Sequence, residues 1–144
     1  MDKEYEIIEH TADVGLKIFG RTKQDLFQNA ARGMFFLITG SNTFFEQTKN
    51  RKYYKVKCEG SSLEDLLVSW LSDLLYIHNT DYVIFDDFNI KDFTEEFIQA
   101  EIRGVKIRDF PYQVELEIKA VTYHELQVFK NKKGLWEATI IFDI

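Results

Sequence analysis

The sequence has a single cysteine, Cys58, and a single proline, Pro111, among 144 residues. One cysteine excludes a disulfide framework and a zinc site built on thiolates. No apolar run approaches the roughly 20 residues that a transmembrane helix needs, and the first six residues are too polar for a signal peptide. Repeats, linkers and low-complexity segments are also missing. We therefore expect one domain over residues 1–144 of a cytoplasmic protein that does not associate with membranes.

Basic residues are scarce as well, because 18 Lys and Arg stand against 24 Asp and Glu and give a formal net charge of −6. Nucleic-acid-binding proteins usually carry a basic stripe that displaces counterions from phosphates. Here the basic residues cluster only at 49–52 and 130–133, both in predicted turns. We expect no direct, tight binding of nucleic acid; a cation or a basic protein surface suits this charge better.

Apolar residues are plentiful, at 45% of the chain with 13 Phe, and their spacing predicts two amphipathic helices. The first begins at Thr22, which with Asp25 forms an Asp version of the capping box, and ends with Gly40 at position C′. The second begins with a capping box formed by Ser61 and Glu64, and a leucine-rich stripe follows.

The rest of the chain alternates between apolar and polar residues, which is typical of strands. Residues 131–134 predict a hairpin loop in which Gly134 can adopt a positive φ. A doubly wound nucleotide-binding fold is excluded, since there is no Gly-rich turn from strand to helix. We predict an α+β fold, with two amphipathic helices packed on a mixed, largely antiparallel sheet of about six to seven strands. The predicted strands are 14–19, 54–58, 82–90, 96–107, 113–122, 126–130 and 135–142.

The stretch EHTADVG at residues 9–15 concentrates polar groups between two apolar stretches that are typical of strands. Asp and Thr at such a break can satisfy backbone N–H groups in a turn. Alternatively, Asp13 is a hard oxygen ligand for a cation, and Gly15 allows close approach of the backbone. A metal site would need a second acidic group from elsewhere.

The last two residues offer that group. Asp143 and the α-carboxylate of Ile144 place two anionic oxygens side by side, which costs free energy unless a cation or a basic group lies between them. Carboxylates without His or Cys favour Ca²⁺ or Mg²⁺ over zinc. The alternative is a solvated C-terminus.

A further polar segment is KAVTYH at residues 119–124. Strand register places Lys119 on the polar face, where a solvated lysine is the ordinary case, and His124 alone is more often a strand-end residue than a ligand. We expect His78 to serve as a cation at the end of the second helix.

These three segments together resemble the archease family: His10-Thr11-Ala12-Asp13-Val14, the segment from Lys119 to His124, and the terminal Ile140-Ile141-Phe142-Asp143-Ile144. Their order and spacing match along the whole chain. The resemblance implies an α+β protein that is not itself an enzyme and that activates the RtcB-type RNA ligase. It would promote the GTP-dependent guanylylation of a ligase histidine, and multiple turnover, in tRNA splicing or RNA repair.

The resemblance also implies a divalent metal site, with Ca²⁺ favoured and Mg²⁺ or Mn²⁺ as alternatives. Its ligands would be Asp13, Asp143 and the terminal carboxylate of Ile144. Residues that match other motif positions, and for which a functional or partner-binding role is expected, are His10, Lys119, Tyr123 and His124.

The chain departs from the family at the end of the first helix, where many members have an acidic residue and this sequence has Gly40. If that acid helps to hold the metal, this protein has lost a ligand or replaced it with Ser41, Asn42 or water.

Two other functions fit the same residues. One is a general chaperone-like binding module that uses aromatic surface patches. The other is a metal-dependent phosphohydrolase that uses the same carboxylates, and it is disfavoured because no nucleophile or paired general acid stands out. No GxSxG, P-loop or HExxH motif is present either.

Overall fold

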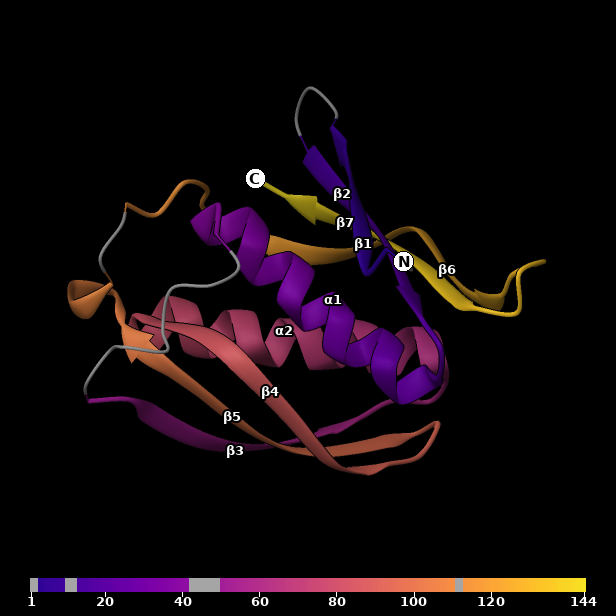
Figure 1. Cartoon of the computed structure of the whole chain (residues 1–144), viewed down its shortest axis with the longest axis horizontal. Helices are drawn as coiled ribbons and strands as arrows, with labels where there is room; N and C mark the ends of the chain where they lie inside the picture. Colours follow the sequence, from indigo (N-terminus) through magenta and orange to yellow (C-terminus); the bar gives the residue numbers. More distant parts are fainter. Residues whose placement is uncertain (1–2, 10–12, 42–49, 111–112) are drawn as a thin grey trace.

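The computed structural model describes residues 3–9, 13–41, 50–110 and 113–144. Seven strands and two α-helices confirm the α+β prediction (Figure 1). In chain order they are β1 (Tyr5–Glu9), β2 (Asp13–Gly20), α1 (Lys23–Thr39), β3 (Lys52–Glu59), α2 (Leu63–Asp81), β4 (Val83–Phe93), β5 (Phe97–Lys106), β6 (Ala120–Lys130) and β7 (Trp136–Asp143), with a 3-10 turn at Ile107–Asp109. None of the described helices is long and apolar enough to cross a membrane.

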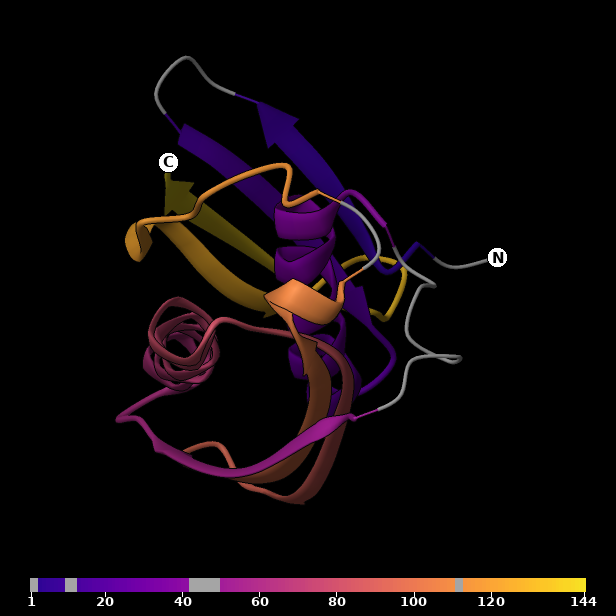
Figure 2. The same ribbon diagram turned by 90° about the vertical axis from the view of Figure 1, so that its left-hand side faces the viewer.

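The strands form two antiparallel sheets, a four-stranded one in the order β1-β2-β7-β6 and a three-stranded one in the order β3-β5-β4. We had expected a single sheet. Alternation along a strand shows that one face is buried, but it does not show which strands are neighbours. The helices fill the space between the sheets: α1 packs on β2 and β4, and α2 packs on β6 and β3 (Figure 2).

The core lies in this helical layer and on the two sheet faces turned toward it. Leu16 and Ile18 of β2 and Phe142 of β7 are fully buried, as is Trp70 of α2. The indole Nε1 of Trp70 donates a hydrogen bond of 2.9 Å to the carbonyl of Phe27 in α1. A buried indole needs such a partner, and this one ties the two helices together.

Helix α1 has both predicted caps. The Thr22 hydroxyl accepts a hydrogen bond from the N–H of Asp25 at 3.0 Å, and Gly40 is left-handed with φ of 72°. For α2 the predicted cap is wrong by one residue. Ser62 is the N-cap and accepts from Asp65 N–H at 3.1 Å, while the Asp65 carboxylate accepts from Ser61 N–H at 2.9 Å. Two serines in a row left two equivalent starts for the same motif.

The predicted strand at 113–122 is also wrong in its first part, because residues 113–119 belong to neither sheet. Their alternation is nevertheless real, since Val114 and Leu116 pack against the core and Ile118 is buried. The N–H groups of Glu115 and Leu116 both donate to the carbonyl of Ile38, at the end of α1. The segment therefore alternates because one side of it packs on the core beside the end of α1, and strand pairing starts only at Ala120.

Candidate metal site

Three strand ends meet at one edge of the four-stranded sheet. Asp13 is the first residue of β2 and lies directly opposite Asp143 of β7, and Asp143 lies opposite Ala120, the first residue of β6. Directly opposed residues of antiparallel strands project on the same face, with Cβ atoms about 5 Å apart. The fold therefore places opposite each other two acidic residues that are 130 positions apart in the sequence.

The Asp13 side chain carries a polar atom that the rest of the described structure leaves unsatisfied. Its Oδ1 is buried and has no hydrogen-bond partner within the described residues. A buried acceptor without a partner costs about 1–3 kcal/mol. A hard cation would satisfy this oxygen, because Ca²⁺ and Mg²⁺ bind carboxylate oxygens.

Protein side chains alone do not complete such a site. Across residues 3–9, 13–41, 50–110 and 113–144, no three His, Cys, Asp or Glu side chains are close enough to hold a metal together. Ca²⁺ and Mg²⁺ commonly complete their shells with backbone carbonyls and water. Ile144 directly follows Asp143, and this residue is 36% exposed. His10 and Asn42 lie outside the described residues.

Lys119 is held beside this pair of acids by its backbone. Its N–H donates a hydrogen bond of 2.8 Å to the carbonyl of Asp143, directly before β6 begins. The lysine side chain is exposed. The backbone of Lys119 thus lies beside Asp143, and the exposure of its side chain agrees with the polar position expected for it.

Gly15 has a different neighbour from the one we expected. It lies opposite Ile141, and a Cβ built on it would come within 2.7 Å of Ile141 Cδ1 and 3.3 Å of the Ile140 carbonyl. The space above this glycine is therefore filled by an isoleucine side chain, so the glycine serves packing within the sheet.

Tyr123 and His124 lie farther along β6, in an irregular part of the strand. The register jumps between Thr122 and Gln127, and Glu125 adopts a positive φ of 53°. Such bulges re-aim side chains beside functional sites. Here the His124 side chain is exposed. The backbone N–H of His124 donates a hydrogen bond of 3.2 Å to Thr122 Oγ1.

The bulge directs Tyr123 toward α2. Its hydroxyl donates a hydrogen bond of 2.7 Å to Oδ1 of Asp65. This bond raises the pKa of Tyr123, whereas the backbone N–H of Ser61, followed by the Tyr123 hydroxyl, lowers the pKa of Asp65. Asp65 therefore both caps α2 and anchors the bulge, a role that sequence reasoning missed because nothing in the chain links positions 65 and 123.

Glu115 is a second residue that the sequence did not single out. A Cβ built on Gly40 would lie 3.0 Å from Glu115 Cγ, so this side chain occupies the space beside the end of α1. Ser41, proposed as a substitute ligand, is engaged locally: its N–H donates to Thr39 Oγ1, and its carbonyl accepts from the same hydroxyl.

His78 lies at the end of α2 as expected, but not as a cation. It is buried, and its Nδ1 lies 2.8 Å from the carbonyl of Val83, so this nitrogen must carry the proton. Burial lowers the pKa of His78 and favours the neutral imidazole. The ring thus joins the last turn of α2 to β4 by a hydrogen bond.

Comparison with known proteins shows one consistent family. Residues 5–144 match the model of the Archease protein family (MTH1598/TM1083). "Protein archease" of Methanosarcina mazei is 38% identical, with 99% of this chain and 97% of that protein covered, and "Protein archease" of Pyrococcus abyssi is 32% identical with 99% of each covered. The solution structure of Methanobacterium thermoautotrophicum protein 1598 superposes with a TM-score of 0.73 at 26% identity, covering 98% of this chain and 99% of that one.

Proposed function

The chain belongs to the archease family, and we propose that it is a metal-binding protein cofactor that activates an RtcB-type RNA ligase in the cytoplasm. In this role it promotes GTP-dependent guanylylation of the ligase histidine and supports multiple turnover in tRNA splicing or RNA repair. It has no catalytic activity of its own. Asp13, Asp143 and the terminal carboxylate of Ile144 hold the divalent cation, with Ca²⁺ favoured.

One observation carries this proposal: a buried oxygen of Asp13 without a partner lies directly across the strands from Asp143. An arrangement that only stabilised the fold would place a donor there, since burying such an oxygen costs free energy. When bound, a cation would supply a fixed positive charge at this edge of the sheet.

The residues around the acids position the contact surface. The hydrogen bond from Lys119 N–H to Asp143 fixes the start of β6, and the hydrogen bond from Tyr123 to Asp65 fixes the bulge that follows. Lys119 and His124 therefore lie on ordered backbone, where a partner protein can contact their side chains. The activator must bind the competent conformation of the ligase more tightly than the idle one, because equal affinity shifts no population.

A GMP-transfer assay on the partner ligase tests the proposal. Stimulation should need this protein, disappear with chelator, and return with added Ca²⁺, Mg²⁺ or Mn²⁺. Asp13→Asn should remove it, and so should deletion of Ile144, which leaves a terminal carboxylate but moves it by one residue. Lys119→Ala should weaken it without changing cation binding.

Asp92→Asn is the matched control, because it makes the same change at an exposed position of β4 in the other sheet. Full stimulation by Asp13→Asn would show that the site is assigned wrongly. If the protein instead stimulates unrelated client proteins, and chelator does not change this effect, the result would support a general chaperone. Turnover of nucleotide or RNA phosphate without ligase would establish an enzyme.

A further inference from the structure

The outer face of the four-stranded sheet carries a second group of residues, at the end of the strands opposite the acids. Phe19 of β2 lies opposite Glu137 of β7, and Glu137 lies opposite Phe129 of β6. Two phenyl rings therefore flank one carboxylate on this face. The rise along β2 from Asp13 to Phe19 is about 20 Å, so this group is separate from the candidate metal site. Figure 1 shows the C-terminus and the hairpin between β6 and β7 at opposite ends of the strands.

A cavity of about 640 Å³ lies over these rings. Its apolar walls are Phe19, Phe129 and Leu135, and the remainder of its lining is mostly charged. A second cavity of about 310 Å³ shares Lys3, Phe19 and Leu135 with the first. The two cavities thus form one groove across the end of the sheet, which we term the hairpin groove.

Positive charge dominates the larger cavity although the chain as a whole is acidic. Four lysines line it against two glutamates, and the lysines are Lys3, Lys130, Lys132 and Lys133. Glu6 pairs with Lys3 at 2.8 Å, so these two charges offset each other and three lysines remain against Glu137. Glu137 keeps its charge and accepts a hydrogen bond of 3.1 Å from Asn131 Nδ2. The ammonium groups of Lys3, Lys17 and Lys133 lower the pKa of Glu6, which shows that several positive charges converge here.

The hairpin that carries two of these lysines is ordered by its own hydrogen bonds. Asn131 Oδ1 accepts from the N–H of Lys133 at 2.9 Å and from the N–H of Leu135 at 3.1 Å, and Gly134 completes the turn with φ of 80°. Lys132 and Lys133 are exposed on this turn. Their charges are therefore fixed beside the exposed ring of Phe129 and are not dispersed on a loose loop.

We propose that the hairpin groove binds a single strand of nucleic acid, with bases stacked on Phe129 and Phe19 and phosphates beside the lysines. Aromatic side chains flanked by basic residues are the common platform for such strands. The two phenylalanines start from strands about 9.5 Å apart, which is too far to sandwich one base and suits successive nucleotides. The few lysines and the net negative charge make this binding weak and salt-dependent, so it agrees with the expected lack of tight binding.

Fluorescence anisotropy with a labelled oligouridylate of about ten nucleotides, at low salt, tests this proposal on the full chain. The double variant Lys132→Glu/Lys133→Glu should lose roughly tenfold or more in affinity. Phe129→Leu keeps an apolar side chain but removes the stacking ring, and should lose about fivefold. The logarithm of affinity should fall with the logarithm of salt concentration with a slope of about −2 to −3 for three or four phosphates.

The double variant Lys55→Glu/Lys57→Glu is the matched control, because it changes net charge equally at exposed positions of β3 in the other sheet. It should change affinity by less than about threefold. Equal losses in the two double variants, binding of polyglutamate as strong as that of RNA, or no loss in Phe129→Leu would overturn the proposal. ATP competing as well as the oligonucleotide would also overturn it, because the groove would then be a mononucleotide site. The metal-site variant Asp13→Asn should bind RNA like the parent, so this test is independent of the proposed activation of a ligase.

Discussion

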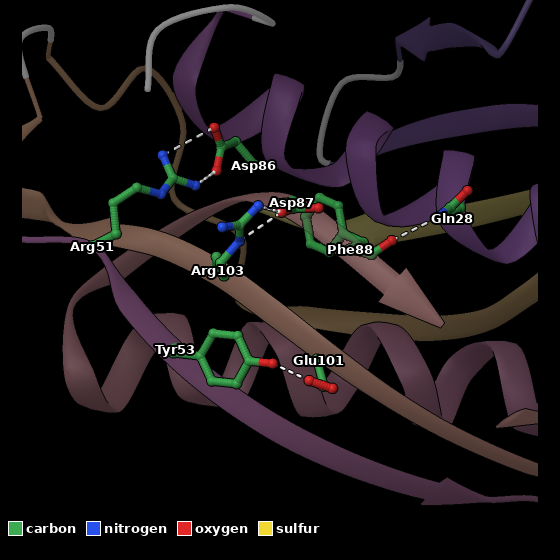
Figure 3. A network of polar contacts seen from close by, with 8 residues as sticks. All are labelled: Gln28, Arg51, Tyr53, Asp86, Asp87, Phe88, Glu101 and Arg103. Carbon is green, nitrogen blue, oxygen red and sulfur yellow. Dashed lines mark hydrogen bonds and ion pairs between the residues drawn. The ribbon is translucent and has the colours of Figure 1, made fainter. Parts of the chain in front are cut away.

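The two sheets differ in how some of their acidic side chains are satisfied. Three acids of the three-stranded sheet have side-chain partners: Asp86 pairs with Arg51, Asp87 pairs with Arg103, and Glu101 accepts from the Tyr53 hydroxyl (Figure 3). On the four-stranded sheet, Asp13 keeps a buried oxygen without a partner among the described residues, across from a second acid.

Two backbone carbonyls on the free edge of β4 also have side-chain partners. Gln28 of α1 donates to the carbonyl of Phe88 at 2.6 Å, and Gln24 donates to that of Ile90 at 3.3 Å (Figure 3 shows Gln28). Buried polar groups are normally satisfied, so exceptions mark places where an ion binds or a functional constraint acts. The difference supports our proposal that the four-stranded sheet carries the functional groups, while the three-stranded sheet stabilises the fold.

The largest expected effect comes from one glycine in each sheet. A Cβ on Gly104 of β5 would lie 1.9 Å from the Ile84 carbonyl oxygen, which is backbone and cannot move aside. Gly104→Ala should therefore lower the free energy of unfolding by at least about 3 kcal/mol. Gly15→Ala meets the flexible end of Ile141 and should cost about 1 kcal/mol. Urea unfolding measures the stability of both variants. Equal losses in the free energy of unfolding would contradict the view that the three-stranded sheet stabilises the fold.

The next effect concerns the oxygen without a partner. In the presence of chelator, Asp13→Asn should raise the free energy of unfolding by about 1–2 kcal/mol, because it removes a partly buried charge across from Asp143. Excess Ca²⁺ should stabilise the parent and leave the variant unchanged. Asp92→Asn should stay within about 0.5 kcal/mol of the parent in both conditions. If Ca²⁺ does not change the melting temperature of the parent protein, the proposed metal site is wrong.

The sequence predicted those parts of the fold that depend on local patterns. Both helices, the cap at Gly40 and the turn at Gly134 follow from spacing and from the φ angles that glycine allows. The proximity of Asp13 and Asp143 followed only from the resemblance to a family, since local pattern does not determine which strands pair.

The remaining features are tertiary and could not be read from the chain. The division into two sheets depends on how both helices are covered, and residues 113–119 alternate against a helix end instead of a strand. The contact of Tyr123 with Asp65 depends on a bulge in β6. The residue with positive φ in this bulge is Glu125, and glutamate is not a typical turn residue. Non-glycine residues rarely adopt that conformation, so no sequence rule would have placed it there.

A smaller effect distinguishes two histidines. Burial lowers the pKa of His78 in the folded protein, so below about pH 6.5 the unfolded chain binds the extra proton first. The free energy of unfolding should therefore fall as the pH drops from 7 toward 5. His78→Gln should flatten this dependence, whereas His124→Gln, at an exposed position, should preserve it. Urea titrations at several pH values measure the slopes, and identical slopes in the two variants would argue against a neutral His78.

The smallest effect separates two ion pairs of the three-stranded sheet. Arg51 and Asp86 have side chains only 24% and 20% exposed, whereas those of Arg103 and Asp87 are 53% and 37% exposed. A double-mutant cycle with Arg51→Gln and Asp86→Asn should give a coupling of about 1 kcal/mol, while the exposed pair should give a coupling too small to resolve. Burial raises the pKa of Asp86 even though Arg51 opposes that shift, so removing Arg51 alone leaves a half-buried carboxylate that protonates more readily. High salt should abolish whatever coupling the exposed pair has and spare most of the other. Equal couplings in the two cycles would mean that burial does not set the strength of these pairs.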